Sequence, residues 1–397
     1  MILGADWVIP VDGPPVRGGA VRIEDGRITE VSDALEPDER FEHAAILPGL
    51  VNAHTHLEYQ SMSAMGDGLP FAPWIKQLIE RKEGLDREDY LAQARAGVHA
   101  CLEGGVTTIA DCSYADTVAE AAVEQGLRAI VYLEAFSLDG NPTERMAERL
   151  DDLPQDDLIR PGISPHAPYT VTVDHYADLI ALARSRGLPV ATHLLESDQD
   201  TRPLAELAEL LGPDTVGIHL VRADGDDLDL LAERNVPVIH CPRSNALLGC
   251  GTAPVPEMLE RGLRVGLGTD SPASALTFDM WDEMRAAILV ARARAARPDA
   301  LGAGRALRMA TIDGARAIGL GDDVGSITPG KRADLTVLDL NGSPFLPWDD
   351  PETAVVYGGT PSRVVVTLVE GKIRYRRTGI HADTESARAV RARMLRY

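Results

Sequence analysis

Eight short apolar runs recur through the middle of the chain and alternate with longer amphipathic stretches rich in Ala, Leu, Glu and Arg. Alternation of strand and helix indicates a parallel sheet, because each parallel connection needs a crossover long enough for a helix. Eight such units predict an α/β fold that closes into a (β/α)₈ TIM barrel. An open doubly wound sheet is the alternative, but no glycine-rich phosphate motif follows the first run. The runs are 49–56, 105–113, 128–136, 160–168, 189–197, 215–221, 236–242 and 264–271.

The two ends of the chain differ from the middle, because they show short apolar alternations around tight turns. Hairpin signals lie at Asp25-Gly26 and at Glu370-Gly371. Each end is too small to bury a core alone. We therefore expect both ends to build one small β-sandwich, with the barrel inserted between its halves. The predicted parts are the first sandwich half at 1–47, the barrel at 48–322, and the second half with a terminal helix at 323–397.

The charge balance excludes several classes of partner. The chain has 61 acidic and 39 basic residues and a net charge of -22, whereas nucleic acids and anionic membranes attract a basic face. No apolar run approaches the roughly 18 residues that span a bilayer, and the first residues do not resemble a signal peptide. The four cysteines form no C-x-x-C pair. We therefore predict a cytoplasmic protein that acts on a small molecule.

Histidines gather at the carboxyl ends of the predicted strands, where six of the ten stand. In a (β/α)₈ barrel these ends meet on one rim, which carries the chemistry. His54 and His56 are two residues apart on one strand, so both point to the same side. Three neutral imidazoles and one carboxylate suit a divalent ion such as zinc. The rim residues are His54, His56, Asp111, Glu134, His166, His193, His219, His240 and Asp270.

Several segments at these strand ends have the form of known motifs. They are PGLVNAHTHLE at 48–58, THLLES at 192–197, GIHLV at 217–221, HCPRSN at 240–245 and GTDSPAS at 268–274, followed by GSITPGKRADLTVLD at 325–339. With these motifs the chain resembles the amidohydrolase superfamily, in particular its mononuclear deaminase and chlorohydrolase branch. The resemblance covers essentially the whole chain and implies the barrel with its small β-domain.

The resemblance also implies roles for the rim residues. Glu196, three residues after the histidine of the fifth strand, would protonate a ring nitrogen of the substrate, while His219 and Asp270 would orient water and take its proton. Binuclear relatives use a carbamylated lysine at the end of the third or fourth strand, and no lysine stands there in this chain. We therefore expect one metal ion, zinc, with iron as the alternative. The implied metal ligands are His54, His56, His193 and Asp270.

Four further residues are candidate substrate contacts. Phe71 and Trp74 lie on the long loop after the first strand, in a chain with only 5% aromatic residues, and could cover a flat ring. They could equally pack that loop onto the barrel. His166 matches a substrate-contacting position of the family. Glu134 could accept hydrogen bonds from a sugar hydroxyl or an amine, or form a buried salt bridge with an arginine.

We predict a metal-dependent hydrolase in which activated water attacks an aromatic ring carbon and ammonia leaves. Adenosine derivatives, including S-adenosylhomocysteine, methylthioadenosine and aminodeoxyfutalosine, are the expected substrates. One alternative is chloro- or aminohydrolysis of a triazine or guanine; another is an amidohydrolase-like synthase that closes a heterocycle. An inactive barrel that serves as a binding protein is the non-enzymatic alternative. The resemblance further implies a homodimer.

Overall fold

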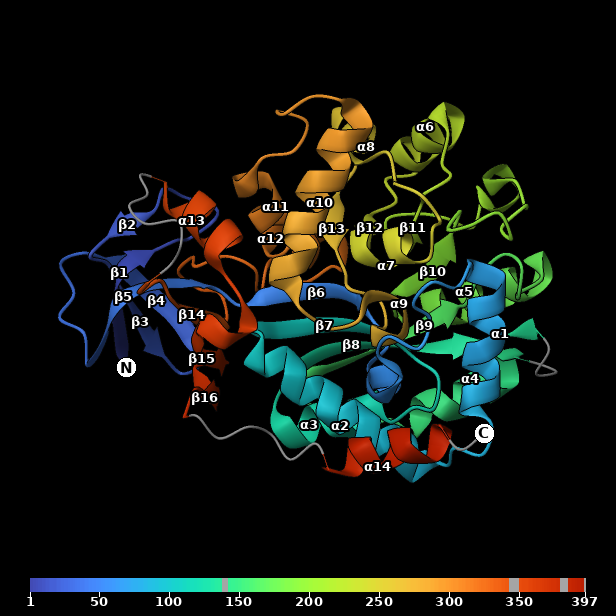
Figure 1. Ribbon diagram of the computed structural model, residues 1–397, viewed down its shortest axis with the longest axis horizontal. Helices are drawn as coiled ribbons and strands as arrows, with labels where there is room; N and C mark the ends of the chain where they lie inside the picture. Colours follow the sequence, from blue (N-terminus) through green and yellow to red (C-terminus); the bar gives the residue numbers. More distant parts are fainter. Residues whose placement is uncertain (138–141, 343–349, 379–384, 396–397) are drawn as a thin grey trace.

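A parallel barrel of eight strands forms the centre of the molecule in the computed structural model, which describes residues 1–137, 142–342, 350–378 and 385–395 (Figure 1). Each predicted apolar run forms one strand, and neighbours along the chain are neighbours in the sheet. The predicted (β/α)₈ barrel is therefore confirmed. Its strands are β6 (Leu50–Thr55), β7 (Val106–Ser113), β8 (Arg128–Ala135), β9 (Ile159–Pro165), β10 (Val190–Leu194), β11 (Thr215–His219), β12 (Val238–His240) and β13 (Val265–Leu267).

The barrel closes at a seam between β6 and the segment that follows β13. The amide of Asp270 donates to the carbonyl of His54 at 2.9 Å. Nearby, the Asn52 side chain donates to the Thr269 hydroxyl at 2.8 Å and accepts from the Thr269 amide at 2.9 Å. Gly268 is needed here, because a Cβ at this position would lie 2.6 Å from the His54 nitrogen. The seam thus brings two predicted metal ligands, His54 and Asp270, next to each other.

Side chains alternate between the two faces of each barrel strand, as the pleat requires. On β8, Ile130 and Tyr132 join the inner core of the barrel, whereas Val131 and Leu133 pack outward against the helices. Glu134 is the next inward position beyond Tyr132, so it reaches the rim rather than the core. The pleat of the strand therefore directs Glu134 toward the cavity at the rim.

Helices surround the barrel, and several begin at an aspartate or threonine that caps the first turn. Asp86 and Asp224 each form a reciprocal capping box with the third residue of the helix. The barrel-associated helices are α1 (Phe71–Lys82), α2 (Arg87–Glu103), α3 (Val118–Gln125), α4 (Pro142–Asp151), α5 (Val173–Ser185), α6 (Gly225–Glu233), α7 (Pro242–Leu247), α8 (Val255–Glu260), α9 (Pro272–Ala275), α10 (Met280–Ala295), α11 (Ala303–Met309) and α12 (Ile312–Ala317), with 3₁₀ turns η1 (Leu57–Met62) and η3 (Leu204–Leu207).

The two chain ends meet in a second sheet beside the barrel, at the left of Figure 1. Its strand order is β16-β15-β14-β5-β1-β3-β4, with β2 paired to β1, so hydrogen bonds join both ends into one continuous sheet. The prediction of one small β-structure from both ends is thus confirmed; the exact domain boundaries stay predictions. The strands are β1 (Ile2–Val8), β2 (Val16–Arg17), β3 (Ala20–Glu24), β4 (Arg27–Ser32), β5 (Glu39–Pro48), β14 (Leu335–Asp339), β15 (Val364–Val369) and β16 (Lys372–Arg376).

The last described helix, α14 (Glu385–Met394), packs on α2 and η1 rather than on the second sheet (Figure 1). Arg391 donates to the carbonyls of Ser61 at 3.0 Å and Ser63 at 2.8 Å, and the Ser61 hydroxyl donates to Ala387 at 2.8 Å. Between the sheet strands lie α13 (Pro351–Gly358) and the turn η4 (Pro361–Arg363). Within the described residues, no helix has the length and apolar character of a membrane span.

Candidate active site

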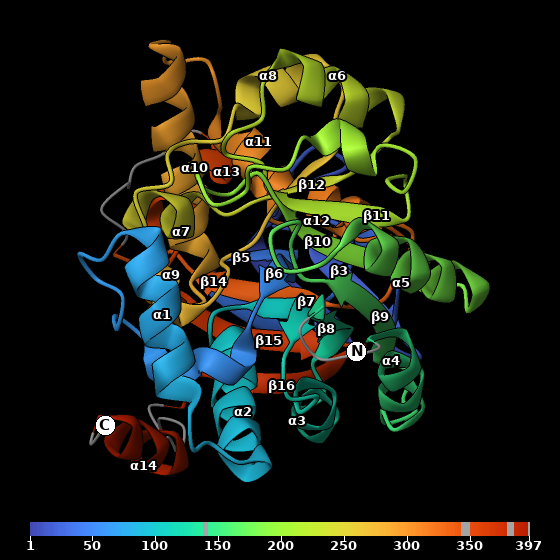
Figure 2. The same ribbon diagram turned by 90° about the vertical axis from the view of Figure 1, so that its right-hand side faces the viewer.

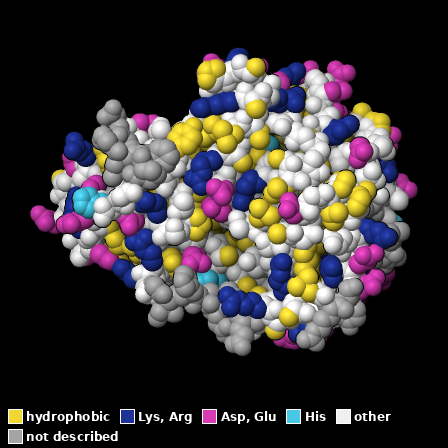
Figure 3. All heavy atoms as spheres, viewed as in Figure 1, with side chains coloured by type: hydrophobic (Ala, Val, Ile, Leu, Met, Phe, Trp, Pro, Cys, Tyr) yellow, Lys and Arg dark blue, Asp and Glu magenta, His cyan; other side chains and the backbone are white. Residues whose placement is uncertain are grey.

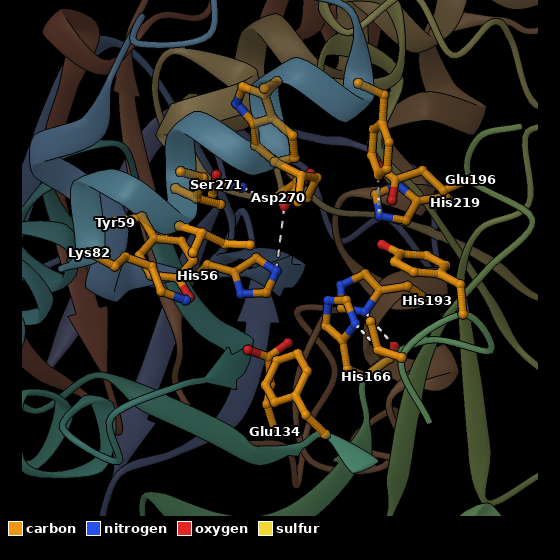
Figure 4. A pocket seen from close by; sticks show the side chains of 18 residues that line it. His56, Tyr59, Lys82, Glu134, His166, His193, Glu196, His219, Asp270 and Ser271 are labelled. Atoms are coloured by element: carbon orange, nitrogen blue, oxygen red, sulfur yellow. Dashed lines mark hydrogen bonds and ion pairs between the residues drawn. The ribbon is translucent and has the colours of Figure 1, made fainter. Parts of the chain in front are cut away.

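A chamber of about 230 Å³ opens at the carboxyl ends of the barrel strands (Figure 4). Strand ends supply its floor, and α1 supplies part of its wall; Figure 2 shows α1 in front of the barrel. Of the predicted metal, catalytic and substrate residues, His54 alone does not line the chamber surface, because it lies beneath the others at 1% exposure. The structure therefore brings all of the predicted catalytic and substrate residues around one cavity.

The four predicted metal ligands form one cluster. The Nε2 atoms of His54 and His56 each lie 3.5 Å from Oδ1 of Asp270. The ring of His193 lies 5.0 Å from the ring of His54, measured between centroids. His54, His56 and Asp270 form one group whose ligand atoms all lie within 4.8 Å of one another, and His193 lies within the same distance of His54 in one group and of His56 in another. Sequence spacing thus predicted a real juxtaposition.

Hydrogen bonds to backbone carbonyls orient two of the imidazoles. Nδ1 of His56 lies 2.9 Å from the Cys112 oxygen, and Nδ1 of His193 lies 2.8 Å from the His166 oxygen. Because a carbonyl oxygen only accepts, each Nδ1 carries the proton and each Nε2 keeps a lone pair directed into the cluster. The backbone of the neighbouring strand therefore selects the tautomer that can bind a cation.

Burial keeps these imidazoles neutral. It lowers the pKa of His56 to about 3 and that of His193 to about 4, with repulsion from neighbouring imidazoles adding to the effect. Burial alone would raise the pKa of Asp270, but contact with His54 and the nearby His219 holds it well below its usual range. The cluster thus offers neutral nitrogens and one carboxylate, the protonation states that metal binding requires.

Glu196 and His219 lie together on the other side of Asp270. Nε2 of His219 is 3.7 Å from Oε1 of Glu196, and the two side chains share a group of mutually close atoms with Asp270. Burial raises the pKa of Glu196 well above its usual range, and the charge of Asp270 adds to this rise. Burial therefore favours the protonated form of Glu196, which is the form that donates a proton.

Helices α7 and α9 hold the acid–base residues in place. The hydroxyls of Ser244 and Ser274 donate to Oδ2 of Asp270 at 2.6 Å and 3.0 Å. The Asn245 amide lies 3.0 Å from Nδ1 of His219. The sequence alone did not reveal these roles, although Ser244 and Asn245 belong to the HCPRSN motif and Ser274 ends GTDSPAS. In the sequence, a sign of these roles is that the three residues follow β12 and β13 by only a few positions. A short helix lies over the rim at each of these places.

The two aromatic residues of the loop after β6 line the chamber from α1. The rings of Phe71 and Trp74 lie 5.7 Å apart between centroids, and both side chains are buried. Nε1 of Trp74 donates to the Ala273 carbonyl at 3.2 Å, so the indole also ties α1 to α9. A Cβ at Gly66 would lie 2.0 Å from this indole. Trp74 therefore both faces the cavity and packs the loop, and the predicted stacking on a substrate ring stays a prediction.

His166 and Glu134 form the side of the chamber next to His193. Nδ1 of His166 lies 2.8 Å from the Thr170 hydroxyl, and its ring lies 4.8 Å from that of His193. Glu134 is 4% exposed, and its Oε1 atom has no hydrogen-bond partner among the described residues. Arg149, at 2.6 Å, donates to the backbone carbonyl of Glu134. The alternative interpretation of Glu134, a carboxylate–arginine salt bridge, is not found among the ion pairs of the described residues.

Lys82, at the end of α1, also lines the chamber, and sequence reasoning missed it. Its Nζ atom donates to the Tyr59 hydroxyl at 3.1 Å and lies 3.4 Å from the centroid of the Tyr114 ring. Burial lowers the pKa of Lys82, although Glu134 and Glu58 oppose this fall. The sequence offered one signal, because this lysine ends the helix that carries the two aromatic residues.

Glu58 of the HTHLE motif has a structural role in the described chain. Its carboxylate accepts from the hydroxyls of Ser113 and Thr117 at 2.9 Å and 2.7 Å. It also accepts the backbone amides of Tyr114, Ala115 and Thr117. Five donors saturate this carboxylate, so it fixes the loop after β7 rather than facing the substrate.

Barrels with a cluster of histidines and carboxylates at the carboxyl ends of their strands are typical of hydrolases that activate water. The amidohydrolase family matches residues 45–374, and the chain therefore belongs to that family. This membership, together with relatives that are named deaminases, confirms the predicted class of hydrolase acting on C–N bonds.

Curated relatives match almost the whole chain. The 5'-deoxyadenosine deaminase of Methanothermobacter thermautotrophicus is 35% identical over 393 residues, which cover 92% of this chain and 91% of that protein. The 5-methylthioadenosine/S-adenosylhomocysteine deaminase of Syntrophobacter fumaroxidans is 35% identical over 403 residues, with 94% and 92% covered.

Solved structures share the fold over its full extent. An adenosine deaminase from Xanthomonas campestris, with bound zinc, has a TM-score of 0.94 and 30% identity, covering 100% of this chain and 98% of its own. An atrazine chlorohydrolase from Arthrobacter aurescens with zinc has a TM-score of 0.88 and 22% identity, with 99% of each chain covered. At that identity the second likeness concerns the fold alone.

Proposed function

We propose that this chain is a zinc-dependent aminohydrolase that removes the exocyclic amino group of an adenosine-like substrate and releases ammonia. The observation that carries the proposal is the placement of Glu196, whose pKa burial raises, close to Asp270, whose pKa is held below its usual range. Both belong, with His219, to a group whose atoms lie within 4.8 Å of one another. Hydrolytic deamination needs such a pair, because water must lose a proton and the ring must gain one.

The donor set fits zinc. Nε2 of His54 is buried without a hydrogen-bond partner in the described chain and lies among the other predicted ligands, so its lone pair is available to a cation. The residues that would hold the ion are His54, His56, His193 and Asp270. When bound, zinc lowers the pKa of coordinated water from 15.7 toward about 7. The zinc in the similar adenosine deaminase supports this assignment.

The acid–base steps follow from the positions of this chain's own residues. Asp270 takes a proton from water; its carboxylate is held by the hydroxyls of Ser244 and Ser274 at Oδ2 and by the Ser271 amide at Oδ1. The water oxygen bonds to the ring carbon that bears the amino group, and Glu196 gives its proton to the adjacent ring nitrogen. The proton held by Asp270 then reaches the amino group, the C–N bond breaks and ammonia leaves, and the remaining hydroxyl proton returns to Glu196 as the product carbonyl forms.

The walls of the chamber support a flat heterocycle with a polar substituent. Phe71 and Trp74 provide an aromatic surface, whereas His166 and Glu134 provide hydrogen-bonding groups. We propose these four as substrate contacts. The relatives named for 5'-deoxyadenosine and methylthioadenosine support a purine nucleoside.

An ammonia-release assay on the zinc-loaded protein tests the proposal. The panel contains adenosine, 5'-deoxyadenosine, methylthioadenosine, S-adenosylhomocysteine, guanine and a chlorinated triazine. We expect turnover of at least one adenosine derivative, accompanied by the absorbance change of adenine to hypoxanthine, and none with Glu196→Gln beyond about 1% of wild type. Turnover of guanine or triazine alone would contradict the proposal.

Two sequence predictions remain to be tested, namely the homodimer and the cytoplasmic location. Light scattering of the purified protein tests the first, and fractionation of the producing cell tests the second. On the face in Figure 3, acidic and basic side chains are interspersed, so this face offers no basic patch to nucleic acid.

A further inference from the structure

Residues with left-handed backbone conformation stand at three of the strand ends around the chamber. The φ angles are 50° at Leu195 after β10, 75° at His219 at the end of β11, and 64° at Asp270 after β13. Residues other than glycine seldom adopt this conformation, because the Cβ atom crowds the backbone, and such residues cluster at functional sites. His219 and Asp270 are themselves proposed acid–base residues. Leu195 is not, but the residue that follows it is Glu196.

A carboxylate holds Leu195 in this conformation. Oδ2 of Asp200 accepts a hydrogen bond from the Leu195 amide at 2.5 Å, and the Leu195 carbonyl accepts one from the Arg222 amide at 2.9 Å. The chain turns back between Leu195 and Asp200, and the Asp200 amide donates to the Ser197 carbonyl at 3.3 Å. The peptide groups on both sides of the Leu195 Cα atom are thus fixed. They set the direction in which the chain enters Glu196.

Asp200 is buried, which strengthens this bond and makes its loss costly. The residue is 9% exposed, and its Oδ1 atom has no hydrogen-bond partner among the described residues. Burial raises the pKa of Asp200 to about 6, while the bond from the Leu195 amide opposes this rise. The side chain is therefore ionised above about pH 6, and an ionised acceptor forms the stronger kind of hydrogen bond. Without this acceptor, the Leu195 amide would be a buried donor that has lost its partner.

We propose that Asp200 is a positioning residue for Glu196, because its bond to the Leu195 amide maintains the turn that directs the Glu196 side chain toward His219 and the cavity. Nε2 of His219 lies 3.7 Å from Oε1 of Glu196, and Figure 4 shows the two side chains next to each other. Asp200 does not line the chamber, so its effect passes through the turn. The inference rests on the proposed function, in which Glu196 gives a proton to the ring.

Loss of the carboxylate should affect Glu196 and spare the metal ligands. A leucine without this bond is more stable in the extended region than in the left-handed one, and that change would turn the Glu196 side chain away from His219. His193 lies within β10, before the turn, and its Nδ1 atom is held by the His166 carbonyl. The zinc content of an Asp200 variant should therefore match that of wild type.

A double-mutant cycle tests the proposal. The kcat, KM and zinc content are measured for wild type, Asp200→Ala, Glu196→Gln and the variant with both changes. The substrate is the adenosine derivative that the ammonia-release panel shows to be turned over fastest. We expect Asp200→Ala to lower kcat by about 10-fold in the wild-type background but by less than about twofold in the Glu196→Gln background. In the second background the misplaced side chain no longer gives a proton, so its position matters little.

Equal losses of kcat in both backgrounds would overturn the proposal, because Asp200 would then support the fold or the ligand set rather than Glu196. An unchanged kcat in Asp200→Ala would overturn it as well. Where Asp200→Ala does not fold, Asp200→Ser takes its place in the cycle, since the shorter side chain does not reach the Leu195 amide. We expect the same losses from this variant.

Asp198→Ala is the matched control, and Asp200→Asn is the conservative variant. Asp198 lies in the same turn, but its side chain is exposed and accepts a 3.4 Å hydrogen bond from Gln199. We expect Asp198→Ala to keep kcat within about twofold of wild type, as is usual for a surface position. Asp200→Asn keeps an oxygen that can accept from the Leu195 amide, so its kcat should stay within about threefold of wild type.

Hydrogen exchange provides a readout that needs no turnover. The Leu195 amide should exchange slowly in wild type and in Asp198→Ala, and at least about 10-fold faster in Asp200→Ala. An equal exchange rate in Asp200→Ala would overturn the proposal. If wild type deaminates no adenosine derivative, the proposed function fails and this inference falls with it. If wild type is active and the losses in the two backgrounds are equal, the proposed function stands and only the role of Asp200 is overturned.

Discussion

The metal wall of the chamber and its lid wall are built in different ways. The metal wall consists of His54, His56, His193 and Asp270, all at strand ends, and hydrogen bonds to backbone or serine partners hold most of them. The lid wall consists of Phe71, Trp74 and Lys82 on α1, which one indole bond and one ammonium contact tie to the rim.

This difference suits the metal wall to the chemical step and the lid wall to substrate recognition. Preorganised groups on strands suit bond-making steps, which tolerate little displacement. Groups on a helix outside the barrel can change without disturbing the ligand set. Substitutions in the metal wall should therefore abolish turnover, whereas those in the lid wall should change KM and specificity.

The largest expected effect is loss of the metal. His193→Ala or Asp270→Ala removes one of four ligands, so the purified variant should contain far less than the about one zinc ion per chain that we expect in wild type. Activity should fall by at least about 10³-fold. Elemental analysis and the ammonia assay measure both quantities. His99→Ala, away from the rim, is the control, and a variant of His193 that retained full zinc would remove that residue from the ligand set.

Glu196→Gln should distinguish metal binding from acid catalysis. The amide keeps the shape of the side chain but cannot give up a proton in the same way, so kcat should fall by roughly 10²-fold or more while zinc content is unchanged. Near-normal turnover would mean that another group protonates the ring, and would favour the cyclising-synthase alternative.

Asn245→Ala tests whether the amide on α7 orients His219. With the 3.0 Å contact removed, the imidazole can rotate, and we expect kcat to fall by about 10-fold with zinc retained. Asn245→Asp should not restore the rate, since an ionised carboxylate cannot donate a hydrogen bond to Nδ1 of His219. An unchanged kcat in the alanine variant would limit this residue to packing.

Trp74→Ala and Trp74→Phe divide the two roles of the indole. Loss of stacking in the alanine variant should raise KM by about 5- to 10-fold with a smaller change in kcat. The phenylalanine variant keeps a ring but loses the bond to Ala273, so it should lose thermal stability with KM nearly unchanged. If KM does not change in either variant, the ring belongs to the loop and not to the substrate site.

The smallest effect is expected at α14. Arg391→Ala removes two bonds to the carbonyls of Ser61 and Ser63 and should lower the melting temperature by about 2–4 °C, while zinc content and kcat stay near wild type. Differential scanning calorimetry with and without substrate analogue measures the shift. A large fall in kcat would place α14 closer to the catalytic step than the contacts indicate.

Strand ends made the metal wall predictable. Because parallel strands of a barrel end on one rim, the order of His54, His193 and Asp270 along the chain was enough to predict their meeting. The position of Glu134 at the end of the third apolar run likewise placed it at the rim.

The lid wall could not be predicted in the same way. Lys82 reaches the chamber through a long side chain from a helix end, and no periodic pattern encodes that reach. Glu58 stands within a motif but has its carboxylate saturated by the loop after β7, and the sequence does not show which of two neighbouring elements will supply the donors. The docking of α14 on η1 depends on contacts between residues far apart in sequence, such as Arg391 with the carbonyls of Ser61 and Ser63 and the Ser61 hydroxyl with Ala387.

The seam has a consequence for how the chain reaches its final form. Asn52 and Thr269, which bond across it, stand 217 residues apart in sequence, so the seam is among the slowest contacts for a folding chain to make. The proposed metal ligands lie on both of its edges, His54 and His56 on one and Asp270 on the other. Zinc bound to residues on both edges would then stabilise the contact between β6 and the segment after β13 that closes the barrel. Amides of β6 and β13 in zinc-free protein should consequently exchange with deuterated solvent faster than those of β8, and zinc should slow them selectively.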